Sequence, residues 1–154
     1  MIKATIFNLN FISGHSSVVE RLVANEKVEG STPFARSNTY MNDLLNKKCV
    51  PCEGGVLPFD ISEIHKYQKK VDGWDILKNE KNIFHLYKKY EFKNFLESKI
   101  FINKVGDISE NEGHHPDISF GWGYAEIKIT THAIEGLSEN DFILAAKIDQ
   151  LINV

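Results

Sequence analysis

The stretch ENEGHHPDISFGWGYAEIKITTH, residues 110–132, decides both the fold and the chemistry of this chain. From Tyr124 to Thr131 polar and apolar side chains alternate, which predicts a β-strand with one wet face and one buried face. The run 118–122 predicts another strand just before it. Three of the six histidines, His114, His115 and His132, flank these strands, and imidazole is the side chain best suited to proton transfer near neutral pH. The pattern favours a shared histidine pocket, although these residues alone leave a simple polar turn as the alternative.

Helical patterns lie on both sides of this stretch. The sequence Ser-Glu-Asn-Asp at 138–141 predicts a helix start, and apolar positions then recur at helical spacing: Phe142, Ala145, Ala146, Ile148 and Leu151. On the N-terminal side, residues 92–105 predict a helix that frays before Glu110.

Further towards the N-terminus, residues 74–77 and 83–90 predict a β-hairpin, and residues 60–70 predict a helix capped by Asp60 or Ser62. Residues 41–59, rich in Pro and Gly, predict an irregular lead-in. The resulting order of helix, two strands, helix, two strands, helix predicts an α+β fold. We expect a two-layer sandwich in which helices pack on one face of a four-stranded antiparallel sheet.

The charged and polar residues of this region form a recognisable set. Glu110, His114-His115-Pro116, Trp122, His132 and Asp141, at these separations, resemble the signature of the pterin-4a-carbinolamine dehydratase family. The resemblance extends through residues 136–141 and back to residues 48–55, covers about residues 41–154, and shows no departure at the signature positions. It implies the family's α+β fold and a hydro-lyase activity, the dehydration of a 4a-hydroxytetrahydropterin to a quinonoid dihydropterin, which recycles a tetrahydrobiopterin-type cofactor.

The resemblance also implies roles for individual residues. It makes His114, His115 and His132 the catalytic set, without assigning which is acid, which is base and which mainly binds. The substrate-binding residues that it implies are Glu110, Pro116, Thr131, Asp141 and Trp122. The carboxylates of Glu110 and Asp141 either accept hydrogen bonds from the pterin or orient an imidazole. Because the elimination consists of proton transfers, it requires neither a metal nor an organic cofactor.

A second class of function is a binding module. The family includes members that act as dimerisation partners of a transcription regulator, but the retained histidines favour the enzyme. We expect a homodimer or homotetramer, because a sheet with helices on only one face leaves aromatic positions near Trp122 or within residues 83–90 to be covered.

Bulk composition excludes several other classes. The chain has 154 residues, of which 42% are hydrophobic and 25% charged, which is ordinary for a globular domain. A net charge of -3 gives no electrostatic reason to bind nucleic acid directly. No apolar run is long enough to span a bilayer, and no secretion signal is recognisable, so we expect a cytoplasmic protein.

The two cysteines, Cys49 and Cys52, are spaced as Cys-x-x-Cys. A structural zinc site needs two further ligands, and no second motif supplies them. A redox role would place the pair between a strand and a helix, whereas here it lies in the Pro/Gly-rich lead-in. We expect neither a metal site nor a redox centre.

Residues 1–40 differ from the rest of the chain. As protein, Ser17 to Glu20 could be a capping box that opens an amphipathic helix. Alternatively, codons for residues 16–21 can spell the D arm of a transfer RNA and those for residues 30–33 its T loop, with matching acceptor-stem ends. We interpret this segment as a spurious extension that resembles a translated glycine transfer RNA gene, so the dehydratase-like domain is expected to be residues 41–154, starting at Met41.

Overall fold

The computed structural model describes residues 43–50 and 57–152, and in this part helices pack on a four-stranded sheet. The elements follow in the order α2 (Ile61–Gln68), β1 (Asp75–Lys78), β2 (Phe84–Glu91), α3 (Phe95–Glu112), β3 (Asp117–Gly121), β4 (Tyr124–Ile129), the short 3-10 helix η1 (His132–Ile134) and α4 (Glu139–Gln150). This order confirms the predicted α+β class. The interpretations of residues 1–40 and of Cys52 lie outside the described residues.

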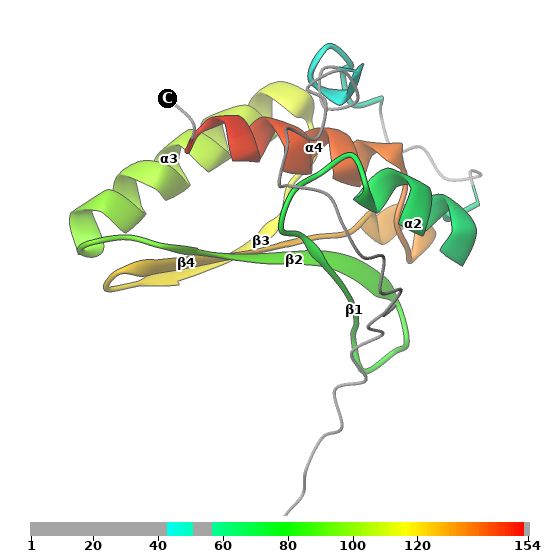
Figure 1. Ribbon diagram of the computed structural model, residues 1–154, viewed down its shortest axis with the longest axis horizontal. Coiled ribbons are helices and arrows are strands. Elements are labelled where there is room, and N and C mark those ends of the chain that lie inside the picture. The colour runs from blue at the N-terminus through cyan, green and yellow to red at the C-terminus, as the bar shows by residue number, and fades with distance from the viewer. Residues whose placement is uncertain (1–42, 51–56, 153–154) are drawn as a thin grey trace, which may run out of the picture. The chain divides into compact units, whose positions relative to one another are not determined.

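The sheet is antiparallel throughout, with the strand order β1-β2-β4-β3. Figure 1 shows α2, α3 and α4 on the same side of it. Most side chains that β2 and β4 direct to this side are buried, because they meet the helices: Leu86, Tyr90, Ala125, Ile127 and Ile129. The predicted alternation in residues 124–131 is therefore confirmed within β4.

The opposite face of the sheet carries both charged and aromatic side chains. Tyr87 and Tyr124 lie on it and are half-buried. Lys89 and Glu126 lie opposite each other in the register of β2 and β4, and their charged groups are 4.0 Å apart. Lys128, on the same face, is exposed. The expectation that an aromatic side chain within residues 83–90 lies on this face holds for Tyr87, and its cover by a second copy stays a prediction.

Helix α3 differs from its prediction at both ends. It begins at Phe95 because Asn94 caps it, the Asn94 side chain accepting a hydrogen bond from Glu97 N at 2.9 Å. It continues to Glu112 instead of fraying before Glu110, and ends where Gly113 takes the left-handed conformation, with φ of 63°. Glycine adopts this conformation without the cost that a Cβ would bring, and the turn aims the next residue, His114, back into the protein.

Strand β4 ends earlier than predicted. Thr131 forms an isolated bridge with Gly136, which closes a small loop and makes His132 the first residue of η1 rather than the end of a strand. Gly136 has no room for a side chain, since a Cβ there would lie 2.5 Å from Cβ of Pro58. The loop is therefore held close against the lead-in.

Helix α4 forms the centre of the core. Its buried apolar residues include Phe142, Leu144, Ala145 and Ile148, so almost every side of the helix is enclosed. Trp74 is 3% exposed and donates through Nε1 to Asp149 at 3.0 Å. In the part of the chain that the structure describes, no helix has the length and hydropathy needed to cross a membrane.

Candidate active site

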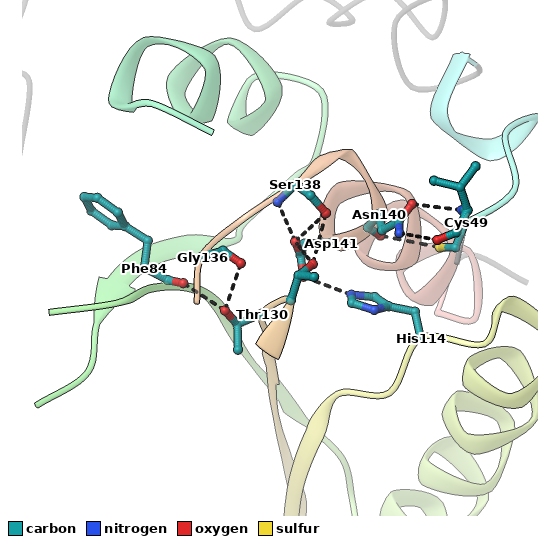
Figure 2. Close-up of polar contacts among 10 residues, drawn as sticks. Cys49, Phe84, His114, Thr130, Gly136, Ser138, Asn140 and Asp141 are labelled. Carbon is teal, nitrogen blue, oxygen red and sulfur yellow. Dashed lines mark hydrogen bonds and ion pairs between the residues drawn. The ribbon is translucent and has the colours of Figure 1, made fainter. Parts of the chain in front are cut away.

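A buried histidine–carboxylate pair lies at the centre of the candidate site. His114 is 6% exposed and Asp141 is fully buried, and Nε2 of His114 lies 2.9 Å from Oδ1 of Asp141. The histidine follows the end of α3 and the carboxylate lies in the first turn of α4, so the pair joins the two helices (Figure 2). In a neutral ring that donates from Nε2, the nitrogen left as an acceptor is Nδ1.

The other oxygen of Asp141 is held by three donors. Oδ2 accepts from Thr131 Oγ1 at 2.8 Å, from the Ser138 backbone N–H at 2.7 Å and from the Ser138 hydroxyl at 3.2 Å. The last two contacts come from Ser138, the N-cap of α4, and Asp141 is the third residue of the helix, so the two residues form a capping box at the predicted helix start. The same carboxylate therefore starts the helix and orients His114. Of the two roles considered for Asp141, the geometry favours orientation of an imidazole over direct contact with a pterin.

His115 and Glu110 form a second pair, which is open to solvent. Nε2 of His115 lies 2.9 Å from Oε1 of Glu110, and the two side chains are 61% and 79% exposed. Five residues separate them, and the turn at Gly113 brings them together after the helix has ended. An exposed pair of this kind contributes little to stability, so both groups are available to a ligand.

His132 and Thr131 are neighbours in the chain with opposite surroundings. Thr131 is 3% exposed and its hydroxyl is committed to Asp141, whereas His132 is exposed on the loop that the Thr131–Gly136 bridge closes. Thr131 thus links His132 to the pair of His114 and Asp141 through a single peptide bond. Its predicted contact with substrate is less well supported than a role in holding Asp141.

Pro116 and Trp122 lie at opposite ends of β3. Pro116 directly follows His115 and is half-buried, next to the histidines. Trp122 lies in the turn between β3 and β4 and is 75% exposed. Strand β3 has five residues, which corresponds to about 16 Å at the usual rise per residue. The structure does not bring Trp122 together with the histidines of its own chain.

Three contacts next to the site were missed by sequence reasoning. Glu112, the last residue of α3, accepts from the Cys49 backbone N–H at 2.9 Å and from Lys147 Nζ at 2.6 Å. Asn140, adjacent to Asp141, exchanges two hydrogen bonds with the Val50 backbone, at 3.1 Å and 2.7 Å. Glu112 and Asn140 gave no sequence signal, because the residues that they bind are far away in the chain. Cys49 is 63 positions from Glu112, and Val50 is 90 positions from Asn140.

Electrostatics make Cys49 an unreactive thiol. Burial, reinforced by the nearby Glu112 carboxylate, raises the pKa of the Cys49 thiol to about 12, so it is protonated at neutral pH. Burial acts to raise the pKa of the Glu112 carboxyl as well, but hydrogen bonds from Lys147 and the Cys49 N–H outweigh burial and hold that pKa below its ordinary value. Among the described residues, no group of three or more His, Cys, Asp or Glu side chains is arranged to hold a metal ion.

Comparisons with known proteins show the family of the chain. The family model for pterin 4 alpha carbinolamine dehydratase matches residues 58–151. A relative of that name from Rubrobacter xylanophilus is 45% identical over 111 residues, which cover 72% of this chain and all of the relative. Another from Rickettsia canadensis is 49% identical over 113 residues, 73% of this chain and all of the relative.

A solved structure has the same fold. It is described as a transcriptional coactivator/pterin dehydratase from Brucella melitensis, has a TM-score of 0.56 at 22% identity, and covers 61% of this chain and 97% of its own. Fold and sequence together place this chain among the small α+β hydro-lyases that act on pterins. It belongs to the pterin-4a-carbinolamine dehydratase family, and its activity is the dehydration for which that family is named.

Proposed function

We propose that the chain dehydrates a 4a-hydroxytetrahydropterin by acid–base chemistry of His114, His115 and His132. In this elimination a base removes the proton on N5, the N5 electron pair forms the C4a=N5 double bond, and the C4a–O bond breaks. The departing hydroxyl takes a proton from an acid and leaves as water, so the product is a quinonoid dihydropterin. No electron is gained or lost, and two positioned proton-transfer groups are sufficient for the step.

The buried pair of His114 and Asp141 is the observation that supports this proposal. Asp141 accepts hydrogen bonds with both oxygens, so it orients the ring of His114 with Nε2 as donor. Nδ1 of His114 is then the acceptor for the substrate proton. The imidazoles of His115 and His132 are exposed, so either can reach a bound substrate and protonate the leaving hydroxyl, and Glu110 orients His115 at 2.9 Å.

Turnover of a 4a-hydroxytetrahydropterin by the purified protein tests the proposal. We expect the dehydration to accelerate over its spontaneous rate, and His114→Gln to remove most of the acceleration. His65 is the matched control, because it is an exposed histidine on α2 outside the site, and His65→Gln should leave the rate unchanged. Equal rates for the two variants would contradict a catalytic role for His114.

We also propose that the protein is a homo-oligomer built on the free edge of β3. Exposed apolar side chains gather there and on the adjoining side of α3, and the rings of Phe95 and Phe120 join the two elements at 5.6 Å. The set comprises Phe95, Leu96, Ile100, Ile118 and Phe120. A second copy that continues the sheet would cover both the unpaired strand edge and this apolar surface.

Light scattering distinguishes this assembly from the alternative of a binding module for another protein. We expect a dimer or tetramer at micromolar concentration, and a Phe120→Lys variant that dissociates. A clean monomer would refute self-association and leave the apolar surface to a different partner.

We further propose that the working domain starts at Met41. Two relatives align over their whole length yet cover only 72% and 73% of this chain, so part of the chain has no counterpart in them. A protein starting at Met41 is therefore expected to turn over as fast as the full chain, and loss of solubility or activity would contradict the proposal.

A further inference from the structure

A strap of chain, defined as residues 47–50, runs across the end of α3 and the start of α4. Its inner half is held by Cys49 N–H donating to Glu112 and by the reciprocal pair of hydrogen bonds between Val50 and Asn140. Its outer end is held by Lys47, whose Nζ lies 2.7 Å from Oε1 of Glu139. Figure 2 shows Asn140 joined to the segment that carries Cys49, while the adjacent Asp141 is joined to His114.

The residues that hold the strap are next to the residues of the histidine pair. Glu112 is two positions before His114, at the end of α3, and Asn140 is directly before Asp141, at the start of α4. The strap therefore connects the two backbone segments whose side chains must meet at 2.9 Å. A displacement of about half an ångström is enough to impair a catalytic arrangement.

Glu112 also joins the helices directly. One of its oxygens accepts from the strap and the other from Lys147, which lies on α4. The side chains of Glu112 and Lys147 are 9% and 18% exposed, so this pair is shielded from solvent and better defined than a surface ion pair. Asn140 is 5% exposed and its amide supplies both a donor and an acceptor to Val50. Each polar group of this connection has a specific partner.

We propose that Asn140 and Glu112 are positioning residues of the dehydratase site. Through the strap and Lys147 they fix the end of α3 against the start of α4, and so keep His114 in hydrogen-bonding range of Asp141. They touch neither the substrate nor the reacting atoms. The proposal rests on the proposed role of His114, and it extends the site to a part of the chain that carries no acid–base group.

The test combines kinetics with a direct view of the imidazole. Asn140→Ala removes both bonds to Val50, and we expect kcat to fall about 10-fold while KM changes less than about twofold. In the NMR spectrum, the proton on Nε2 of His114 should broaden or exchange faster, because its hydrogen bond to Asp141 is no longer held at a fixed length. Lys47→Ala is the matched control, since it releases only the outer end of the strap, and it should change neither kcat nor the His114 signal.

A second variant covers the case in which Asn140→Ala does not fold. Glu112→Gln keeps the shape of the side chain and one acceptor but loses the charge that Lys147 requires, so it should broaden the same His114 signal and lower kcat. The proposal would be overturned if Asn140→Ala or Glu112→Gln had the same kcat as Lys47→Ala and an unchanged His114 signal. It would also be overturned if kcat fell while the His114 signal stayed unchanged. A broadened signal with normal kcat would support the strap's role and instead contradict the catalytic role of His114.

Discussion

Exchange of Asp141 for asparagine tests the central pair with a change of one atom. The carbonyl oxygen of the amide can take the place of Oδ2 and accept from Thr131 and Ser138 as the carboxylate does. The NH₂ group then faces Nε2 of His114 at the position of Oδ1. Because the amide nitrogen donates, Nε2 must become the acceptor and the ring proton must move to Nδ1.

The loss of stability follows from the bonds that change. Hydrogen bonds to a charged group contribute about 1 kcal/mol more than neutral ones, and the two short bonds to Oδ2, at 2.7 and 2.8 Å, lose that charge. We therefore expect unfolding to become easier by about 2 kcal/mol, which lowers Tm by roughly 10 °C for a domain of this size. The protein should remain folded at 25 °C.

The loss of activity should be much larger than the loss of stability suggests. With the proton on Nδ1, His114 cannot accept the substrate proton from that atom, so the contribution of a positioned base is removed. We expect turnover per folded molecule to fall by about 10²- to 10⁴-fold.

Two measurements on Asp141→Asn test this prediction. The control is Asn46→Asp, which replaces an amide with a carboxylate at an exposed position. Thermal unfolding gives the folded fraction, and the nitrogen chemical shifts of the His114 ring report which nitrogen carries the proton. Turnover within about threefold of the unchanged protein, or the proton still on Nε2, would refute the proposed orientation of His114 by Asp141.

Three further outcomes are expected. His115→Ala and His132→Ala should each lower turnover at least about 10-fold while Tm changes little, because both side chains are exposed and leave no cavity; a loss of Tm with normal activity per folded molecule would make them structural. Replacement of Cys49 and Cys52 by serine, or prolonged dialysis against EDTA, should leave turnover within about twofold, and metal retained in proportion to activity would contradict this. The pKa of Glu112 is lower in the folded state than in the unfolded state, so the ionised carboxylate stabilises the fold fully above pH 4.5, and this stabilisation is lost as the pH falls below that value. The Tm difference between Glu112→Gln and the unchanged protein should therefore shrink from pH 7 to about pH 3.5. A Tm difference that stays constant with pH would contradict this assignment.

Local periodicity explains which elements could be predicted. The alternation in β4 and the capping box of α4 depend only on neighbouring residues, and both are present as expected. The end of α3 was misplaced because Gly106 and the buried Ser109 interrupt its apolar stripe. Ser109 is tolerated there because its hydroxyl donates back to Val105 O at 2.8 Å, a contact that apolar spacing does not reveal.

The site was predictable in its residues but not in their grouping. The signature includes both His114 and His115, yet nothing in the sequence separates the buried ring from the exposed one. That difference arises from the left-handed turn at Gly113 and from a carboxylate 27 positions away. The role of Ser138 was visible only as a helix cap, and its second role as a partner of Asp141 in orienting His114 required the packing of α4 beside the end of α3.

The double use of Asp141 has a consequence for how the protein loses function under stress. Because the bond from the Ser138 amide both begins α4 and holds the carboxylate that orients His114, the first turn of that helix cannot fray without dismantling the site. Hydrogen exchange of this single amide proton should then follow inactivation during heating, and the site should give no partly active, locally melted form. Each molecule is therefore either fully active or inactive, and the curve of activity against temperature should superimpose on the melting curve of α4.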